Sequence, residues 1–307
     1  MHRRPLLVVT GPTASGKTRR AVDLARALDA EIISADSRQI YRGMDLGTGK
    51  DLDEYGDVPY HLIDIAPAGY RYNLYEYLRD YDRAESLVRA RGRMPLLCGG
   101  TGLYVESVLR GLHLPEVPAD EELRARLAGK SMAELTDMLA SMKRLHNNTD
   151  TDTPKRAIRA IEIELYYQAH PEEACATRPS PRTDAVTVGV HIGRDERRAR
   201  ISARLHARFE AGMTEEVERL MASGIAADDL IYYGLEYKFI TLFVTGRISR
   251  SEMEQGLETA IHQFAKRQMT WFRGMERRGH TIHWLPYDMP ADEFVETVTR
   301  LLENACP

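Results

Sequence analysis

Near the start of the sequence a short apolar run leads into a glycine-rich segment, LLVVTGPTASGKT at residues 6–18. Residues 11–18 match the pattern G-x-x-x-x-G-K-[ST] at every fixed position. The apolar run predicts a β-strand, and the pattern from Thr18 to Leu28 predicts a helix. A strand, a tight loop and a helix in this order form a phosphate-binding loop, so we expect a phosphorylated ligand.

Each residue type in this loop suits an anion. Glycine lets backbone N–H groups point inward, and the helix N-terminus adds a partial positive charge. The Lys17 ammonium would add a point charge, and the Thr18 hydroxyl could ligate Mg²⁺, the expected cofactor. The expected phosphate-binding residues are Gly11, Pro12, Thr13, Ala14, Ser15, Gly16, Lys17 and Thr18.

Strand and helix patterns alternate along residues 5–114 and then again after residue 184. Strands are expected at residues 6–10, 31–35, 95–98, 185–192 and 281–285, and helices at 18–28, 74–91 and 291–303. Residues 120–170 carry only helical patterns. The sequence therefore predicts an α/β fold with a P-loop NTPase-like core, a parallel sheet flanked by helices. An all-helical domain at residues 118–183 is expected to interrupt the core of residues 1–117 and 184–307.

The composition excludes several classes of protein. The chain has 307 residues, 43% of them hydrophobic and 29% charged, which is typical of globular domains and not of disordered or fibrous chains. Its apolar runs are far shorter than the roughly 20 residues that span a bilayer, so no membrane partner is expected. The three cysteines form no C-x-x-C pair, which favours a reducing, cytoplasmic location without disulfides or structural zinc.

Two side chains follow strands at the edge where the phosphate loop lies. Asp36 follows the second expected strand, and Thr101 follows the strand at 95–98. Ligands bind at the carboxyl ends of parallel strands, so both should converge with the loop. Alternatively, Asp36 caps a helix and Thr101 is a turn hydroxyl. A Mg²⁺-binding acid typical of kinases is not evident, since the strand candidate ending at Asp64 is short.

Basic residues gather in two segments although the net charge is −4. Residues 143–159 and 266–278 are rich in Lys and Arg, and the second also contains Trp271 and Phe272. Basic and aromatic side chains together favour a structured RNA partner. Taken singly, each segment is also explained as a solvated helix face.

Four blocks of the sequence resemble one known family. They are GPTASGKT at 11–18, ADSRQIYRGMDLGTGK at 35–50, GGTGLY at 99–104 and AKRQMTWFR at 265–273, with HLID at 61–64 in support. Over nearly its whole length the chain resembles the tRNA dimethylallyltransferase family, also called tRNA isopentenyltransferases. The resemblance implies transfer of a dimethylallyl group from dimethylallyl diphosphate to N6 of the adenosine 3′ to a tRNA anticodon, with release of diphosphate.

The resemblance also implies roles for individual residues. Asp36 would be the base, Thr101 would hold the reacting groups, and Lys17 would stabilise the diphosphate. A base suits a weakly nucleophilic exocyclic amine, and the adenosine must leave its stack to reach it. The implied tRNA-binding residues are Asp36, Ser37, Arg38, Gln39, Thr101, Arg124, Lys155, Arg156, Ala157, Ile158, Arg159, Lys266, Arg267, Gln268, Met269, Thr270, Trp271, Phe272 and Arg273. The helical domain would embrace the anticodon stem loop, and a monomer is expected.

The chain departs from the family pattern in two places. Many bacterial members carry a Gly-Tyr-Arg-type segment where this chain has residues 233–238, and only Gly234 aligns. Residues 193–197 lack the usual Asp-Arg spacing, although Arg200, Arg204 or Arg208 in the following helix could still reach the diphosphate.

Three other functions compete with the tRNA enzyme. An adenylate isopentenyltransferase would modify free AMP or ADP, but would need neither the helical domain nor the block at 266–273. A P-loop small-molecule kinase would need a clamp for the γ-phosphate, which the sequence does not reveal. A non-catalytic RNA-binding module would use the loop only as an anion site and would tolerate loss of the Asp36 carboxylate.

Overall fold

The computed structural model describes residues 4–145, 149–176 and 179–305. They fall into two compact units, a core unit within residues 1–110 and 181–307 and a helical unit within residues 111–180. The sequence placed these boundaries at 118 and 183. Arg182 belongs to the core unit because its backbone N–H donates to the Leu109 carbonyl at 2.9 Å and its guanidinium binds Glu85. Within the expected linker at 177–182, residues 177 and 178 lie outside the described part of the chain.

The core unit is built on a parallel six-stranded sheet with the order β3-β2-β4-β1-β5-β6. The strands are β1 (Leu6–Thr10), β2 (Ala30–Ser34), β3 (Tyr60–His61), β4 (Met94–Gly99), β5 (Ala185–His191) and β6 (His283–Pro286). The predicted α/β class is confirmed. The sequence offered only a short strand candidate ending at Asp64, whereas β3 lies just before it, because two residues are too few to show a periodic pattern.

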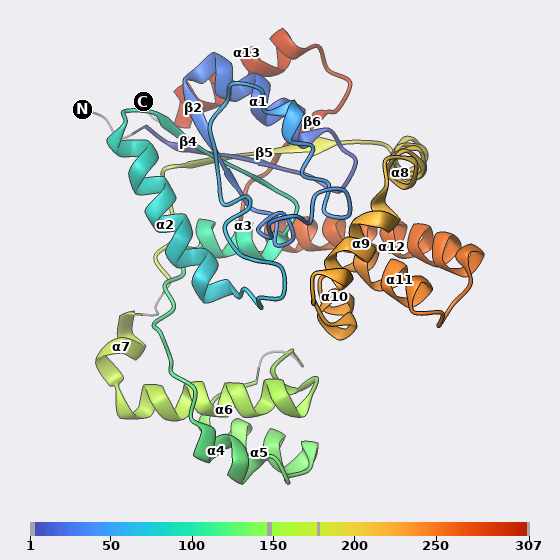
Figure 1. The fold of residues 1–307 in the computed structure, drawn as a ribbon. Coiled ribbons are helices and arrows are strands. Elements are labelled where there is room, and N and C mark those ends of the chain that lie inside the picture. The colour runs from blue at the N-terminus through green and yellow to red at the C-terminus, as the bar shows by residue number, and fades with distance from the viewer. Residues whose placement is uncertain (1–3, 146–148, 177–178, 306–307) are drawn as a thin grey trace. The chain divides into compact units, whose positions relative to one another are not determined.

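Helices cover both faces of this sheet (Figure 1). Every residue of β1 is buried, as expected for a central parallel strand. Helices α1 (Lys17–Leu28) and α13 (Ala291–Ala305) cover one face, where Leu24 and Phe294 join the core cluster of the strands. Helices α2 (Leu74–Ala90), α3 (Gly102–Leu109) and α12 (Arg250–Arg277) cover the other. Burial of each such leucine or phenylalanine stabilises the fold by about 1.5–3 kcal/mol.

Four more helices lie between β5 and α12. They are α8 (Arg194–Glu210), α9 (Met213–Ala222), α10 (Ala227–Tyr232) and α11 (Leu235–Val244). The long helix α12 begins with a capping box, in which Ser249 accepts from the backbone of Glu252 and Glu252 accepts from the backbone of Ser249. The 28-residue helix that starts here carries the predicted block at 266–273.

The helical unit contains α4 (Glu121–Leu127), α5 (Met132–Met142), α6 (Pro154–Ala169) and α7 (Pro171–Ala176), with a short 3₁₀ turn at Thr149–Thr151. No strand occurs among its described residues. Its core gathers leucine, alanine and isoleucine side chains, among them Leu135, Leu139 and Ile161. In the part of the chain that the structure describes, no helix is long and apolar enough to cross a membrane.

Candidate active site at the carboxyl end of the sheet

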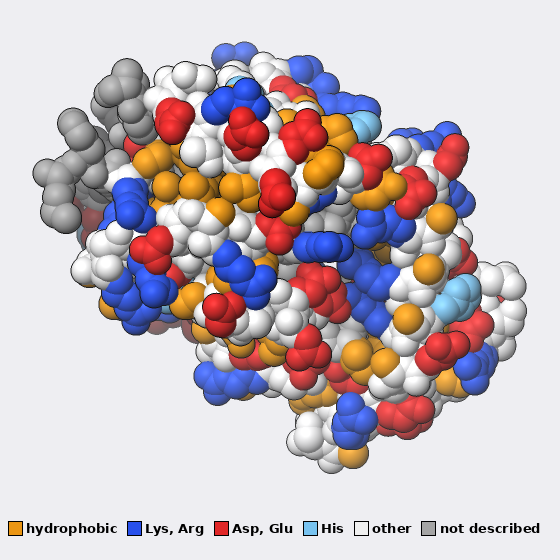
Figure 2. All heavy atoms as spheres, turned by 90° about the horizontal axis from the view of Figure 1, so that it is seen from above, with side chains coloured by type: hydrophobic (Ala, Val, Ile, Leu, Met, Phe, Trp, Pro, Cys, Tyr) orange, Lys and Arg blue, Asp and Glu red, His pale blue; other side chains and the backbone are white. Residues whose placement is uncertain are grey.

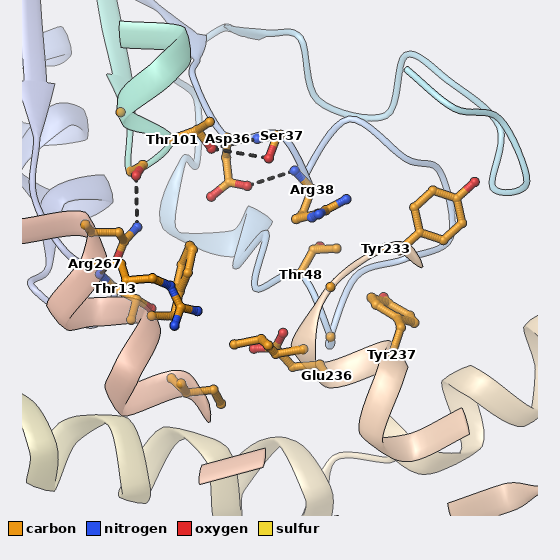
Figure 3. A pocket seen from close by; sticks show the side chains of 18 of the residues that line it. Thr13, Asp36, Ser37, Arg38, Thr48, Thr101, Tyr233, Glu236, Tyr237 and Arg267 are labelled. Atoms are coloured by element: carbon orange, nitrogen blue, oxygen red, sulfur yellow. Dashed lines mark hydrogen bonds between the residues drawn. The ribbon is translucent and has the colours of Figure 1, made fainter. Parts of the chain in front are cut away.

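A pocket of about 540 Å³ opens at the carboxyl end of the sheet, where the loops after β1, β2 and β4 meet (Figure 3). Helices α8, α11 and α12 supply the remaining walls. The three residues with expected catalytic roles, Lys17, Asp36 and Thr101, all line this pocket. The structure therefore brings together side chains from three separate loops, as the topology of a parallel sheet requires.

The phosphate loop has the backbone geometry of an anion nest. Gly11 has a φ of 156°, and a Cβ there would lie 2.8 Å from the Ser15 hydroxyl. Gly16 adopts the left-handed conformation, with a φ of 82°, immediately before α1 begins. Only glycine adopts both conformations without strain, so the motif is required by the backbone.

The eight loop residues divide between two hollows and the core. Thr13 and Lys17 line the large pocket. Ala14, Gly16, Lys17 and Thr18 line a second hollow of about 300 Å³. Gly11, Pro12 and Ser15 are buried behind them. Lys17 thus lies where the two hollows meet.

Arginines of α8 complete the positive surroundings of the loop. Arg204 lines both hollows and donates a hydrogen bond to the Thr13 hydroxyl. Burial, together with the charge of Arg208, lowers the pKa of Arg204 to about 10. Burial also lowers the pKa of Lys17, although Asp36 opposes this effect. Two cations held close together in a partly buried site favour binding of an anion.

Asp36 presents its carboxylate to the pocket (Figure 3). One carboxylate oxygen accepts a hydrogen bond from the backbone N–H of Arg38 at 2.9 Å, which fixes the side chain. Thr101 does not cap α3 with its hydroxyl. Its hydroxyl instead accepts from the backbone N–H of Ser37 at 3.0 Å, so it joins the loop after β4 to the loop after β2.

The loop after β2 is braced by a residue that the sequence did not single out. Both carboxylate oxygens of Glu216 on α9 accept backbone hydrogen bonds, from Asp45 at 2.9 Å, Leu46 at 2.8 Å and Gly47 at 3.1 Å. The Tyr237 hydroxyl also donates to Glu216, at 2.6 Å. A carboxylate held this way fixes the loop that places Gly47 in the pocket wall. Glu216 lies far from the loop in sequence, so no local signal reveals it.

Two further side chains hold the same loop. The ammonium group of Lys50 is buried and donates to the Tyr41 carbonyl at 2.7 Å and to the carboxylates of Asp45 and Asp64. Asp64 ends the short strand that the sequence offered as the position of a Mg²⁺-binding acid. In the structure its carboxylate pairs with the ammonium group of Lys50. Gln39 is buried and donates to the Gly49 carbonyl at 2.9 Å. The expected contact of the Gln39 side chain with RNA is not available in this arrangement.

The segment that departs from the family pattern forms another wall of the pocket. Tyr233, Gly234, Leu235, Glu236 and Tyr237 all line it. Burial raises the pKa of Glu236, and the charges of Arg208 and Arg204 oppose that rise. Glu236 is thus a second carboxylate in the pocket, next to the cations that surround the phosphate loop.

The predicted RNA-binding block on α12 contains both exposed and buried side chains. Exposed ones are Lys266, Arg267, Thr270, Trp271 and Arg273, and Met269 is half-buried. Arg267 and Trp271 line the pocket. Phe272 is fully buried and packs near Trp284, so its expected contact with RNA is not available. Gln268 is 8% exposed and uses both ends of its side-chain amide on the protein.

The other predicted RNA-binding residues lie in the helical unit. Arg124 forms ion pairs with Glu121 and Glu162, Arg156 with Asp152, and Arg159 with Glu162. Lys155 is exposed and Ile158 is half-buried, whereas Ala157 is fully buried in the core of this unit and offers RNA no side-chain surface.

Figure 2 shows Lys and Arg side chains gathered beside a hollow on one face of the molecule.

Comparison with known proteins decides the family. The IPP transferase model matches residues 39–275, and an isopentenyl transferase model matches residues 5–55. The chain is 58% identical over 303 residues to tRNA dimethylallyltransferase 2 of Bacteroides fragilis, covering 97% of this chain and 98% of that one. The chain belongs to the IPP transferase family.

Solved structures agree with this assignment. A tRNA isopentenylpyrophosphate transferase from Bacillus halodurans is 30% identical to this IPP transferase, with a TM-score of 0.72, and the match covers 99% of this chain and 97% of that one. A eukaryotic dimethylallyltransferase acting on tRNA gives a TM-score of 0.82 at 18% identity, over 98% of this chain and 80% of that one. At that identity the second match establishes the fold alone.

The second hollow offers donors that suit a magnesium ion. The Thr18 hydroxyl lines it together with the carboxylates of Asp51 and Glu54. Burial raises the pKa of Glu54, and the negative charge of Asp51 raises it further. Hydroxyl and carboxylate oxygens are ligands that Mg²⁺ prefers. The Asp51 carboxylate also accepts from Arg208 at 3.2 Å, and Arg200 and Arg204 line the same hollow. The described residues hold no cluster of three or more His, Cys, Asp or Glu that could bind a metal unaided.

Proposed function

We propose that this IPP transferase is a tRNA dimethylallyltransferase, which moves a dimethylallyl group from dimethylallyl diphosphate to N6 of the adenosine 3′ to the anticodon and releases diphosphate. One observation carries the proposal: the phosphate loop, Asp36 and Thr101 surround one pocket. The near full-length match to tRNA dimethylallyltransferase 2 of Bacteroides fragilis supports it.

The diphosphate binds at the phosphate loop. The N–H groups of the loop, the ammonium of Lys17 and the guanidinium of Arg204 surround its oxygens. As the bond between C1 of the dimethylallyl group and the diphosphate oxygen breaks, negative charge grows on the leaving group. Fixed cations and N–H groups stabilise that charge, which is the largest contribution expected in such a site. Mg²⁺, held by Thr18 with Asp51 or Glu54, would supply further positive charge there.

The acceptor amine approaches from the Asp36 side of the pocket. An adenosine must leave its stack before N6 can enter. The N6 lone pair forms the new bond to C1 while the C1–O bond breaks, and the N6 proton passes to the carboxylate of Asp36. The hydrogen bond from Arg38 keeps this carboxylate aimed at the pocket. A base placed this way contributes about 10²–10⁴-fold to the rate.

The apolar side of the pocket suits the five-carbon group. Leu103, Ile261, Phe264 and Trp271 line it. Ile261 is buried whereas Leu103, Phe264 and Trp271 stay partly open to solvent, so together they offer the five-carbon group an apolar surface. The exposed basic residues of α12 and the basic side chains of α6 would bind the anticodon stem loop. We further propose that the enzyme acts as a monomer in the cytoplasm, which size-exclusion chromatography and cell fractionation would test.

The experiment that tests this function counts label in two acceptors. Purified protein, Mg²⁺ and radiolabelled dimethylallyl diphosphate are incubated with an anticodon stem-loop RNA or with AMP. We expect label in the RNA and none in AMP. Label in AMP alone would assign the protein to the free-nucleotide enzymes. Consumption of ATP with small metabolites, without label in either acceptor, would instead favour a kinase.

A further inference from the structure

A half-exposed tyrosine lies at the rim of the pocket. Tyr232, the last residue of α10, is 48% exposed. The next residue, Tyr233, is 1% exposed and lines the pocket. The two rings meet edge to face, with centroids 5.9 Å apart. The chain thus passes from the surface to the pocket wall within one residue, and the Tyr232 ring lies beside two residues of that wall, Tyr233 and Arg38.

Two guanidinium groups accompany this ring. The Cζ atom of Arg71 lies 5.0 Å from the centroid of Tyr232, and that of Arg38 lies 5.9 Å from it. Both distances are within the range of cation–π attraction. Arg71 is held by an ion pair of 2.9 Å with Asp229, one turn earlier on α10. Two arginines and one aspartate leave this cluster with a net positive charge.

The cluster is connected to the reacting residues. Arg38 lines the pocket, and its backbone N–H donates to the Asp36 carboxylate at 2.9 Å. Gly234 follows Tyr233, and a Cβ there would lie 3.4 Å from the Arg38 side chain. Arg38 therefore spans the distance between the base and the Tyr232 ring. We therefore expect the chain neighbours of a nucleotide in the pocket to lie near this ring.

An unstacked nucleotide is the partner that fits this surface. Once an adenosine has left its stack, the bases beside it lose a stacking neighbour. Aromatic rings and arginine planes are the surfaces on which proteins stack such bases, and guanidinium groups also attract the phosphates. The exposed Tyr60 lacks this setting, because its ring packs on Tyr55 at 4.9 Å.

We propose that Tyr232, with Arg38 and Arg71, is a stacking platform for the base of a nucleotide next to the target adenosine. The inference rests on the proposed function, since it assumes that the RNA delivers one base into the pocket. It assigns an RNA contact to Tyr232, the residue just before the segment in which this chain departs from the family pattern. It also makes Tyr232 a residue that binds RNA without touching the dimethylallyl diphosphate.

The test compares Tyr232→Ala with Tyr232→Phe. We expect Tyr232→Ala to raise the KM and the Kd for an anticodon stem-loop RNA by about 10-fold or more, because stacking on one base is lost. Tyr232→Phe keeps the aromatic face and should stay within about 2-fold of wild type. The KM for dimethylallyl diphosphate should change by less than about 2-fold in both variants. Tyr60→Ala, at an exposed tyrosine outside the pocket, is the matched control.

A stem loop with an abasic site identifies the stacked base. Removing the base that stacks on Tyr232 should weaken binding to wild type about as much as Tyr232→Ala does, and should weaken binding to Tyr232→Ala no further. Equal RNA affinity of wild type and Tyr232→Ala would overturn the platform, as would a parallel rise in the KM of both substrates.

RNA binding and prenylation are measured separately, so that failure of this inference can be told from failure of the proposed function on which it rests. If wild type binds the RNA but never prenylates it, the proposed function is contradicted. The Kd values of wild type and the variants for RNA still test whether Tyr232 stacks on a base. If Tyr232→Ala fails to fold, Arg71→Gln, at an exposed side chain, replaces it. We expect Arg71→Gln to weaken RNA binding several-fold and to reduce its dependence on salt. Unchanged affinity and salt dependence of Arg71→Gln would overturn the platform as well.

Discussion

The side-chain Oε1 of Gln268 accepts a hydrogen bond from the backbone N–H of Thr13 at 2.8 Å. The Nε2 of the same amide donates to the Gly100 carbonyl at 2.9 Å. One buried side chain of α12 therefore ties the phosphate loop to the loop after β4. Gln268, which the family resemblance predicts to contact tRNA and which also lines the pocket, thus sets the spacing of two of its walls.

Replacing Gln268 by Leu leaves two buried backbone groups without a partner. Each such group costs about 1–3 kcal/mol, so we expect the free energy of unfolding to fall by at least about 2 kcal/mol. We also expect kcat to fall at least 10-fold, because the loops lose their spacing. Urea unfolding and steady-state kinetics measure both. Gln263→Leu, at an exposed position of the same helix, is the control and should change neither quantity. A Gln268→Leu protein with wild-type stability and kcat would show that Gln268 does not hold the two loops together.

Lys17→Met removes the charge at the meeting point of the two hollows. Stabilisation of the leaving diphosphate is lost, so kcat should fall by about 10²–10³-fold. The KM for dimethylallyl diphosphate should also rise. Lys266→Met should act differently, raising only the KM for RNA, because Lys266 lies in the exposed block on α12. A Lys17→Met enzyme within 3-fold of wild type would show that the loop does not hold the leaving group.

Glu216→Gln tests the brace of the loop after β2. The three backbone N–H groups now bonded to the carboxylate would face a neutral amide, one end of which is itself a donor. Hydrogen bonds to a charged group contribute about 1.5–3 kcal/mol each, and we expect a loss of at least about 2 kcal/mol in unfolding free energy. Glu215→Gln, at the exposed neighbouring position, is the control. A Glu216→Gln protein as stable as Glu215→Gln would mean that the loop holds its shape unaided.

The ion pair between Glu85 and Arg182 predicts a pH dependence of stability. Burial raises the pKa of Glu85, but hydrogen bonds and charges from Arg182 and Arg89 lower it more, so it lies below the usual value. A carboxylate with a lowered pKa in the folded state stabilises the fold above the unfolded pKa of about 4.3, and that stabilisation disappears as the pH falls through the folded pKa.

Glu85→Gln should therefore be less stable than wild type at pH 7, by about 2 kcal/mol. The difference should shrink steadily as the pH falls below about 4.3, because wild type then loses the same charge. Urea unfolding at a series of pH values measures this. A difference that stays constant from pH 7 to pH 3 would show that the charge of Glu85 does not stabilise the fold.

Much of the core was predictable because its signals are local. The phosphate loop and the buried strands can be recognised from a few consecutive residues each. The topology of a parallel sheet then places Asp36 and Thr101 beside Lys17. The brace of Glu216 was not predictable, because it joins α9 to a loop about 170 residues away in sequence. The buried faces of Phe272 and Ala157 were also missed, since the resemblance names helical segments without showing which side chains point inward.

Label transfer by the Asp36→Asn variant measures what the base contributes to the reaction. Asparagine keeps the shape of the side chain but cannot accept the N6 proton. We predict that label transfer from dimethylallyl diphosphate to the anticodon stem loop slows by about 10²–10⁴-fold, while binding of dimethylallyl diphosphate stays within a few-fold of wild type. Label transfer at the wild-type rate by Asp36→Asn would contradict the account, because the pocket would then work without the base on which it is built.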